Sequence, residues 1–264
     1  CADYTVLIAT WLKDIDIYIK NRPLKIIMNG ADNLLFSNLN NSHWDFQEPL
    51  KIVTHHWSSN KMKGFNVYQK LDELLNTENF KNLIKFAYIG NLPYGFRFKN
   101  STHIKPLNGE KLASELSKHH VYITASINEP AGMHHIEGAL AGLPIIYRNS
   151  GALPEYCGNY GIGFNDENFL PALKKMIKDY SFYKNKIQNY PFTSEKMNKE
   201  YLELFEDLVS KREIIYKNRN FLRSPIYFLA NSIFIFFFLK KINDQLKVII
   251  KNNLSKIFFI FRNH

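Results

Sequence analysis

Residues 121–147 read VYITASINEPAGMHHIEGALAGLPIIY and decide the expected fold of the chain. The apolar run 121–126 has the character of a buried strand, as has 144–147, and the small residues 138–142 between them suit a helix. A strand, a helix and a second strand in this order predict parallel pairing with a right-handed crossover. We therefore expect an α/β fold with a doubly wound, Rossmann-like parallel sheet, whose ligands bind outside the carboxyl ends of the strands.

Two glutamates lie in the segment that joins these strands. Glu129 precedes the Gly-containing start of the helix, and Glu137 lies inside the helix. Exposed main-chain N–H groups and the helix dipole favour an anion at this point, and carboxylates accept hydrogen bonds from hydroxyl groups. This combination suits a polyol that carries a phosphate, such as a nucleotide-sugar. The alternative is that Glu129 is an acid favoured in a first helical turn and Glu137 is an ordinary surface residue.

Three segments resemble, in this order, the donor site of retaining glycosyltransferases with two Rossmann-like domains, the GT-B architecture. They are Ser126–Gly132, Glu137–Pro144 and Gly151–Glu155, and they look most like glycosyltransferase family 4, also called group 1. The resemblance covers roughly residues 1–215. It implies the C-terminal, donor-binding half of a GT-B fold with a helical C-terminal extension, while the N-terminal acceptor domain is largely missing.

On this interpretation the chain divides into five segments. The sequence begins with Cys1 rather than Met, and no charged-then-apolar signal segment opens it, so we expect it to start inside a longer gene product. The expected segments are the end of the acceptor domain (1–32), a polar linker with Asn38, Asn40 and Asn41 (33–48), the nucleotide-sugar donor-binding domain (49–192), a return helix (193–217) and a basic, apolar tail (218–264).

Apolar runs and helical spacing predict the remaining elements. Strands separated by helices from Leu50 onward extend the parallel arrangement expected around residues 121–147. The expected strands are 5–9, 25–28, 52–56 and 84–89, the expected helices are 11–15, 65–75, 110–119, 166–190 and 194–216, and residues 104–107 are a short connection.

By the resemblance, Glu129 and Lys63 are the catalytic residues. Glu129 contacts hydroxyls of the transferred sugar, and Lys63, which precedes Gly64, binds the diphosphate. A flexible ammonium is a good partner for a departing diphosphate. Many family members carry an Arg five residues before this Lys, where this chain has Ser58. One phosphate cation is therefore absent, and Ser58 or Asn60 is expected to donate neutral hydrogen bonds instead. The alternative for Lys63 is a solvated loop lysine.

The resemblance also implies the donor-binding residues. Glu137 accepts hydrogen bonds from the ribose hydroxyls, and the N–H groups of residues 132–134 face the sugar or the phosphates. His134 can alternatively be a polar residue at the rim of the domain cleft. Asn91 borders the donor at a strand end, and the backbone near Ile104 holds the base. The donor-binding set is Glu137, Gly132, Met133, His134, Ser58, Asn60, Asn91 and Ile104.

We expect neither a metal nor a cofactor besides the nucleotide-diphospho sugar donor. The adjacent histidines of each His-His pair do not share a helix face, so each pair is a poor chelator. Cys1 and Cys157 give no disulfide framework, which favours a reducing compartment. In the mechanism usually drawn for the family, retention needs no protein nucleophile.

The net charge of +10 is concentrated in the C-terminal tail. Residues 211–264 hold eleven Lys or Arg and two acids, so the rest of the chain is nearly neutral. The intensely apolar run 225–239 is shorter than the roughly 20 residues of a membrane-spanning helix, and a second apolar stretch covers 256–262. Apolar aromatics flanked by basic residues suit an anionic membrane surface. The alternatives are a tail that packs on the missing domain and an artefact at a damaged gene end.

The sequence thus predicts a hexosyltransferase-type glycosyltransferase that acts with retention of anomeric configuration. Its partners are a nucleotide-sugar, a carbohydrate or lipid-linked acceptor and, through 218–264, an anionic membrane, but not nucleic acid. We expect it to act in polysaccharide or glycan biosynthesis in the cytoplasm, peripherally at the inner membrane face. The alternatives are a non-catalytic nucleotide-sugar-binding fragment and a GT-B nucleotide-sugar epimerase.

Overall fold

The computed structural model of the chain describes residues 4–15, 23–37, 43–218, 229, 232–245 and 247. The chain forms two compact units, residues 1–206 and 207–264, and each is considered by itself. Residues 38–42 of the predicted linker, with Asn38, Asn40 and Asn41, lie outside the described residues.

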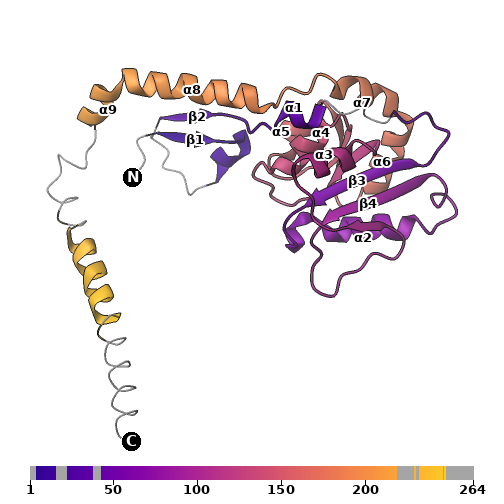
Figure 1. Cartoon of the computed structure of the whole chain (residues 1–264), viewed down its shortest axis with the longest axis horizontal. Coiled ribbons are helices and arrows are strands. Elements are labelled where there is room, and N and C mark those ends of the chain that lie inside the picture. Colours follow the sequence, from indigo (N-terminus) through magenta and orange to yellow (C-terminus); the bar gives the residue numbers. More distant parts are fainter. Residues whose placement is uncertain are drawn as a thin grey trace, which may run out of the picture. The chain divides into compact units, whose positions relative to one another are not determined.

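The first unit is built around a six-stranded parallel sheet (Figure 1). Its strands are β3 (Leu50–His56), β4 (Ile84–Gly90), β5 (Thr102–Ile104), β6 (Val121–Thr124), β7 (Ile145–Arg148) and β8 (Gly161–Phe164). In the order β5-β4-β3-β6-β7-β8, the first of these strands in sequence, β3, lies in the middle of the sheet. The next two strands, β4 and β5, extend the sheet on one side of β3, and β6, β7 and β8 extend it on the other. The direction of winding therefore reverses between β3 and β6, which confirms the predicted doubly wound sheet.

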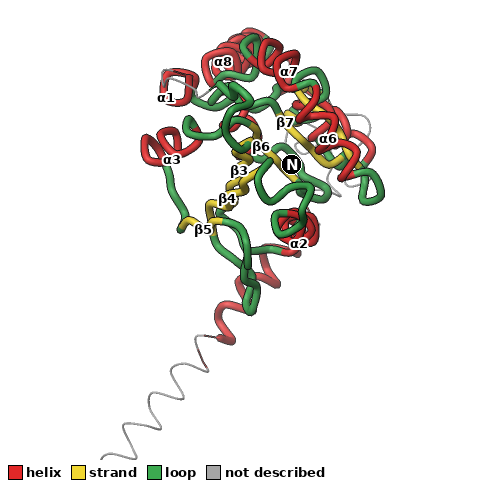
Figure 2. Tube along the Cα trace, turned by 90° about the vertical axis from the view of Figure 1, so that its right-hand side faces the viewer, coloured by secondary structure: helices red, strands yellow, loops and turns green. Residues whose placement is uncertain are grey.

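Helices cover both faces of this sheet. Successive strand residues point to opposite faces, so Val53 belongs to one hydrophobic core and Ile52 to the other. Helices α3, α4 and α5 contribute to the core around Val53, and α2, α6 and α7 to the core around Ile52. Figure 2 shows α3 on one side of the strands and α2 and α6 on the other. The helices are α2 (Phe65–Leu74), α3 (Gly109–Leu116), α4 (Met133–Leu140), α5 (Leu153–Cys157), α6 (Phe169–Lys178) and α7 (Tyr180–Ile187).

The N-terminal segment is held to α5 by two side chains. The Glu155 carboxylate accepts hydrogen bonds from the main-chain N–H groups of Thr10 (2.7 Å) and Trp11 (2.8 Å). The Tyr156 hydroxyl donates to the carbonyl of Ile8 and accepts from the N–H of Asn29, both at 2.7 Å. The segment comprises β1 (Thr5–Leu7), the 3₁₀ helix η1 (Thr10–Asp14), β2 (Leu24–Ile26), which pairs with β1 in parallel, and α1 (Asn33–Ser37).

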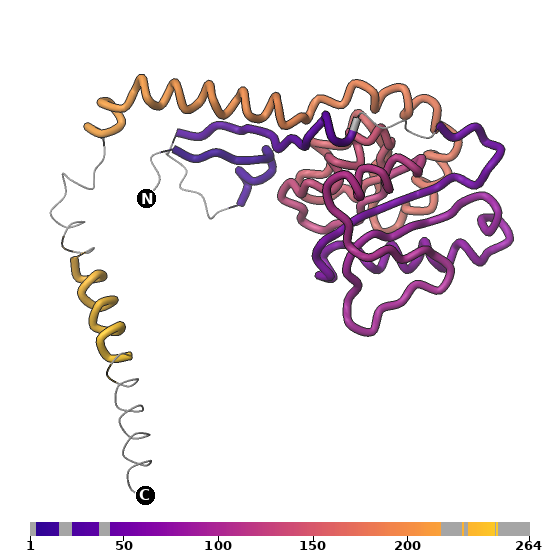
Figure 3. Tube along the Cα trace, in the orientation of Figure 1, coloured from indigo at the N-terminus to yellow at the C-terminus, as the bar shows by residue number. Residues whose placement is uncertain are grey.

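The segment that precedes the six-stranded sheet in the sequence also contacts the segment that follows it. Ala31 forms a parallel bridge with Thr193, and its carbonyl accepts a 2.7 Å hydrogen bond from the N–H of Ser194. Figure 3 shows the two stretches side by side. The C-terminal helix α8 (Ser194–Ser210) thus starts from a point tied to the chain that precedes the sheet.

The structure differs from the sequence-based elements at several places. Residues 102–104 form an edge strand where a connection was expected nearby, and β8 was not predicted because Gly161 and Gly163 interrupt its apolar pattern. The helix predicted at 166–190 is two helices, which meet at Asp179. The helix predicted at 194–216 is likewise α8 and α9 (Arg212–Asn218), interrupted at Lys211.

The second unit includes α9 and a helical stretch at 232–245. Every described side chain of this stretch is exposed, including Phe234, Phe236, Phe237 and Phe238. No helix among the described residues combines the length and the apolar character that crossing a membrane requires. The predicted second apolar stretch, 256–262, lies outside the described residues.

Candidate functional site

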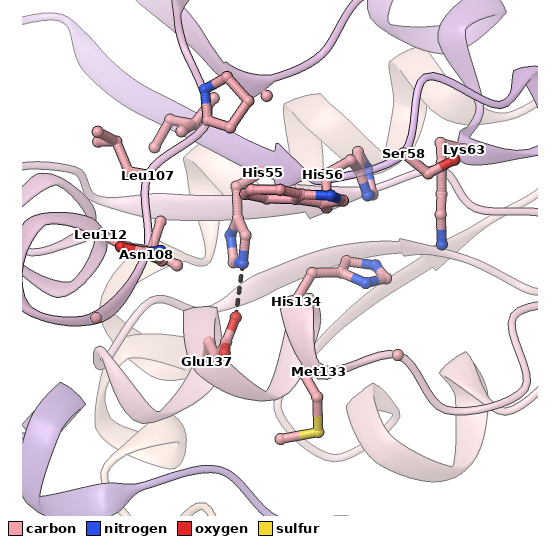
Figure 4. A pocket seen from close by; sticks show the side chains of 16 residues that line it. His55, His56, Ser58, Lys63, Leu107, Asn108, Leu112, Met133, His134 and Glu137 are labelled. Carbon is pink, nitrogen blue, oxygen red and sulfur yellow. Dashed lines mark hydrogen bonds and ion pairs between the residues drawn. The ribbon is translucent and has the colours of Figure 1, made fainter.

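A cavity of about 380 Å³ lies at the carboxyl ends of β3 and β4, beside the start of α4. This is the position where the winding of the sheet reverses and where open α/β sheets bind ligands. Six residues predicted from the sequence line the cavity, namely Ser58, Lys63, Gly132, Met133, His134 and Glu137. All of these except Gly132 are labelled in Figure 4. The structure therefore brings together residues from two separate parts of the sequence.

Glu129 does not itself line the cavity and is only 4% exposed. Its Oε2 is 2.7 Å from the Nζ of Lys63, which lines the cavity. Burying a carboxylate without a partner is costly, and the lysine supplies the opposite charge. Since α4 begins at Met133, Glu129 precedes the helix and is not a residue of its first turn.

Two glycines allow this pair to form. Gly64, which follows Lys63, has φ of +87°, a conformation that favours glycine. A side chain there would also collide with the main chain of Ala125, whose carbonyl oxygen would be 2.2 Å from the added Cβ. At Gly132 an added Cβ would be 2.7 Å from Oε1 of Glu129. The main chain at Gly132 thus passes close to the Glu129 carboxylate, and no side chain at residue 132 crowds that carboxylate.

Glu137 points into the cavity from the second half of α4 and is held by His55 of β3 (Figure 4). The distance from His55 Nε2 to Glu137 Oε2 is 2.7 Å. The other ring nitrogen of His55 is 3.1 Å from the hydroxyl of Tyr122, on the neighbouring strand β6. Burial raises the pKa of Tyr122 well above its usual value, so this hydroxyl keeps its proton.

Two further imidazoles line the cavity beside Lys63. The ring centroids of His56 and His134 are 4.6 Å apart. His56 Nε2 meets the hydroxyl of Tyr68 at 2.7 Å, and His134 Nε2 meets that of Thr124 at 2.9 Å. Burial, and secondarily nearby positive groups, lowers the pKa of both histidines well below the usual value. Both rings are therefore neutral at pH 7, and each can donate one N–H and accept one hydrogen bond.

The start of α4 opens toward the same space. Its N-cap residue, Gly132, makes no side-chain capping hydrogen bond, and the first residues of the helix, Met133 and His134, line the cavity. The first N–H groups of a helix have no partner within it and carry the positive end of its dipole. Together with Lys63, they form an environment that favours an anion.

The remaining predicted residues do not line the cavity. Asn60 caps the 3₁₀ helix η2 (Lys61–Lys63) by accepting a hydrogen bond from the N–H of Met62. Asn91 donates to the carbonyl of Trp57 at 2.7 Å. Ile104 is the last residue of β5 and pairs with β4. Their roles toward a donor remain predictions.

Sequence reasoning did not single out several residues that line the cavity. His55 and His56 were considered only as a possible metal-binding pair, although they end a buried strand, where α/β sheets place their ligand contacts. Trp57 follows them and is 71% exposed. The loop before α3 gives the cavity an apolar end, with Pro106 and Leu107. No group of three or more potential metal-binding side chains occurs within the described part of the chain.

Residues 97–191 match the family model described as Glycosyl transferases group 1. This confirms the resemblance to group 1 glycosyltransferases drawn from the motifs, because the matched region contains Glu129, Glu137 and Gly151–Glu155. Lys63 lies outside the matched region. No curated protein matches the chain.

Solved structures of low sequence identity share the fold. Sucrose-phosphate synthase from Thermosynechococcus elongatus is 18% identical with a TM-score of 0.61, over 80% of this chain and 59% of its own. A glycosyltransferase from Rickettsia africae ESF-5 is 15% identical with a TM-score of 0.59, over 77% and 63%. Anabaena Alr3699/HepE in complex with UDP and glucose is 12% identical with a TM-score of 0.59, over 78% and 63%. The chain therefore has part of the GT-B fold and spans less than two thirds of the length of each of these proteins.

Proposed function

We propose that this chain is the donor-binding part of a glycosyltransferase that transfers a hexose from a nucleotide-diphospho sugar to a carbohydrate or lipid-linked acceptor. One observation carries the proposal. A single cavity, at the point where the sheet reverses its winding, holds a carboxylate, a lysine and an open helix start. A nucleotide-diphospho sugar offers the complementary groups, namely hydroxyls for the carboxylate and phosphates for the cation and the N–H groups.

The cavity also has two chemically different ends. Leu107, Asn108 and Leu112 lie on one side of Glu137, and Lys63 lies on the other (Figure 4). An apolar end suits a nucleobase, and a cationic end suits a diphosphate. The proposed donor therefore lies with its base at residues 106–109, its ribose at Glu137 and its diphosphate at Lys63.

The proposed chemistry is electrostatic. When the bond from the sugar to the diphosphate breaks, negative charge grows on the leaving group, and Lys63 with the start of α4 stabilises it. Glu129 holds hydroxyls of the sugar and keeps Lys63 in place. The acceptor hydroxyl attacks from the face that the diphosphate leaves and passes its proton to an oxygen of the departing diphosphate, so the configuration is retained without a protein nucleophile. We further propose that no metal is needed, and transfer that persists in EDTA would support this.

Donor binding is tested by calorimetric titration of the chain with UDP-, GDP- and ADP-sugars. One of them is expected to bind, and Glu137→Ala is expected to weaken that binding by about tenfold or more, since it removes hydrogen bonds to a charged group. Lys63→Met is expected to weaken binding of the nucleotide-sugar but to change binding of the free nucleoside little. Lys61→Met is the matched control, because Lys61 is an exposed lysine two residues away that does not line the cavity. Equal losses in the two lysine variants would contradict the assignment.

Product analysis of the full-length protein separates transfer from the two alternatives. A lengthened acceptor indicates a glycosyltransferase, and a changed sugar with no acceptor indicates an epimerase. Tight donor binding without either product indicates a binding protein. The anomeric configuration of the product, read by NMR, tests retention.

We also infer that the tail contacts an anionic membrane, which would place the protein peripherally at the inner face. The helical stretch 232–245 exposes Ile233, Leu239 and its phenylalanines, and Lys240 and Lys241 lie in the same stretch. Apolar and aromatic side chains enter the interface while lysines meet anionic headgroups. In liposome flotation, the chain is expected to float with anionic vesicles and not after residues 219–264 are removed. Absence of flotation with anionic vesicles would refute the inference.

A further inference from the structure

The side chain of His55 lies between Tyr122 and Glu137. Its Nε2 is 2.7 Å from Glu137 Oε2, and its Nδ1 is 3.1 Å from the Tyr122 hydroxyl. Its ring also packs edge-on against that of Tyr122, with the centroids 5.6 Å apart. The backbone N–H of His55 donates to the same hydroxyl at 3.1 Å. His55 is thus fixed at both ring nitrogens and by its ring.

The contact with Glu137 decides which ring nitrogen of His55 donates. An ionised carboxylate only accepts hydrogen bonds, so Nε2 of His55 carries the hydrogen that it shares with Glu137. The hydroxyl of Tyr122 lies 3.1 Å from Nδ1, accepts from the backbone N–H of His55 and can donate to its carbonyl oxygen at 3.3 Å. A chain of hydrogen bonds therefore runs from the buried Tyr122 through His55 to Glu137.

This chain fixes one oxygen of the carboxylate and leaves the other for a ligand. Oε2 of Glu137 is bound by His55, whereas Oε1 has no partner in the described part of the structure. The Glu137 side chain is 22% exposed and lines the cavity. A carboxylate already held in one orientation loses little rotational freedom when a hydroxyl binds to it.

We infer that His55 is the positioning residue that makes the site selective for ribonucleotides over 2′-deoxyribonucleotides. The inference rests on the proposed function, in which Glu137 accepts hydrogen bonds from the ribose. The 2′- and 3′-hydroxyls of a ribose are adjacent and point the same way, so both can donate to the fixed carboxylate, whose Oε1 has two lone pairs. A 2′-deoxyribose offers only one of them, and the site then loses one hydrogen bond to a charged group. That loss corresponds to about a tenfold weaker binding or more.

The experiment compares the nucleoside diphosphate that the chain binds, for example UDP, with its 2′-deoxy analogue by calorimetry. Wild type is expected to bind the ribonucleotide about tenfold more tightly or more. His55→Phe keeps a ring against Tyr122 but has no N–H for Glu137, so most of this preference is expected to disappear. His55→Gln is expected to retain part of it, because its amide N–H can reach the carboxylate. His43→Phe, which replaces an exposed histidine away from the cavity, is the control.

The outcomes separate this inference from the proposed function. If His55→Phe keeps the wild-type ratio of the two affinities, the inference is wrong, and donor binding stands. A wild type that binds both nucleotides equally also refutes it. If wild type binds no nucleotide, the proposed function and the inference fail together. If His55→Phe does not fold, His55→Gln decides: a ratio below that of wild type supports the inference, and an undiminished ratio refutes it.

Discussion

His135 provides a quantitative test of whether water is excluded from the interior beside the cavity. The ring lies in α4, is fully buried, and packs edge-on against Tyr156 with the centroids 5.2 Å apart. Neither ring nitrogen has a hydrogen-bond partner in the described part of the structure. Burial, and secondarily the nearby charges of Lys63 and His55, lowers the pKa of His135 to about 3. The ring is therefore neutral in the folded protein at any pH above this value.

The magnitude follows from the difference between the folded and unfolded states. In the unfolded chain a histidine binds a proton near pH 6.5, about its ordinary pKa. Below that pH the unfolded state holds one more proton at this position, so the free energy of unfolding falls as the pH falls, by about 1.4 kcal/mol per pH unit. Between pH 7 and pH 5 the loss from His135 amounts to about 2 kcal/mol. Phenylalanine binds no proton, so His135→Phe removes this loss.

The assay is urea unfolding followed by circular dichroism at pH 5, 6, 7 and 8. The free energy of unfolding of His135→Phe minus that of wild type is expected to grow by about 2 kcal/mol from pH 7 to pH 5. His56 and His134 are present in both proteins, so most of their contribution cancels in this difference, and what does not cancel comes from their interaction with His135. The control is His43→Phe, which replaces an exposed histidine. A difference that grows as much for this control as for His135→Phe would show that burial is not the cause. A constant difference for His135→Phe would refute the reasoning and show that the buried ring is hydrated or protonated.

Three further predictions concern single side chains. Glu155→Ala removes the acceptor for two main-chain N–H groups of the N-terminal segment and is expected to lower the free energy of unfolding, measured in urea, by about 1–3 kcal/mol. In calorimetry it is expected to reduce nucleotide-sugar affinity less than Glu137→Ala does. Equal losses of affinity in the two variants would contradict this prediction. Gly132→Ala places a methyl group 2.7 Å from the Glu129 carboxylate and is expected to weaken donor binding by about tenfold or more, so wild-type affinity by calorimetry would contradict the close approach. Asp72→Ala leaves three consecutive N–H groups at 99–101 without their acceptor. It is expected to lower the midpoint of thermal unfolding and to speed proteolysis of that loop. An unchanged cleavage pattern would contradict this prediction.

Sequence reasoning predicted the centre of the fold well because local signals and tertiary structure agree there. The strands β3, β6 and β7 are almost wholly buried and are built around the apolar runs 52–53, 121–123 and 145–147, as expected for strands buried on both faces. The elements that it missed lack such a signal. β5 is a three-residue edge strand with two exposed polar residues, Thr102 and His103. In β8, Gly161 and Gly163 interrupt the apolar pattern that would predict a strand.

For the site, the sequence predicted residues that lie within one contiguous motif. It missed residues that reach the site only because their strand pairs with a strand from another part of the sequence. Glu129 and Glu137 belong to a contiguous stretch, and the spacing itself is informative. His55 is 82 residues from Glu137, and only the placement of β3 beside β6 brings the two together. The order of strands in a sheet is a long-range property, so no local pattern could have shown that His55 holds Glu137.

The glycine that follows Glu137 has a consequence for how this site can change in evolution. A Cβ at Gly138 would be 2.4 Å from the ring of Tyr122, and the hydroxyl of that tyrosine supports His55. A larger residue at 138 therefore displaces Tyr122, and a smaller residue at 122 leaves a hole and frees His55. Each single change is penalised, whereas a joint change can restore the packing. Positions 55, 122 and 138 are thus expected to vary together among homologous sequences, even though 83 residues separate the first from the last along the chain.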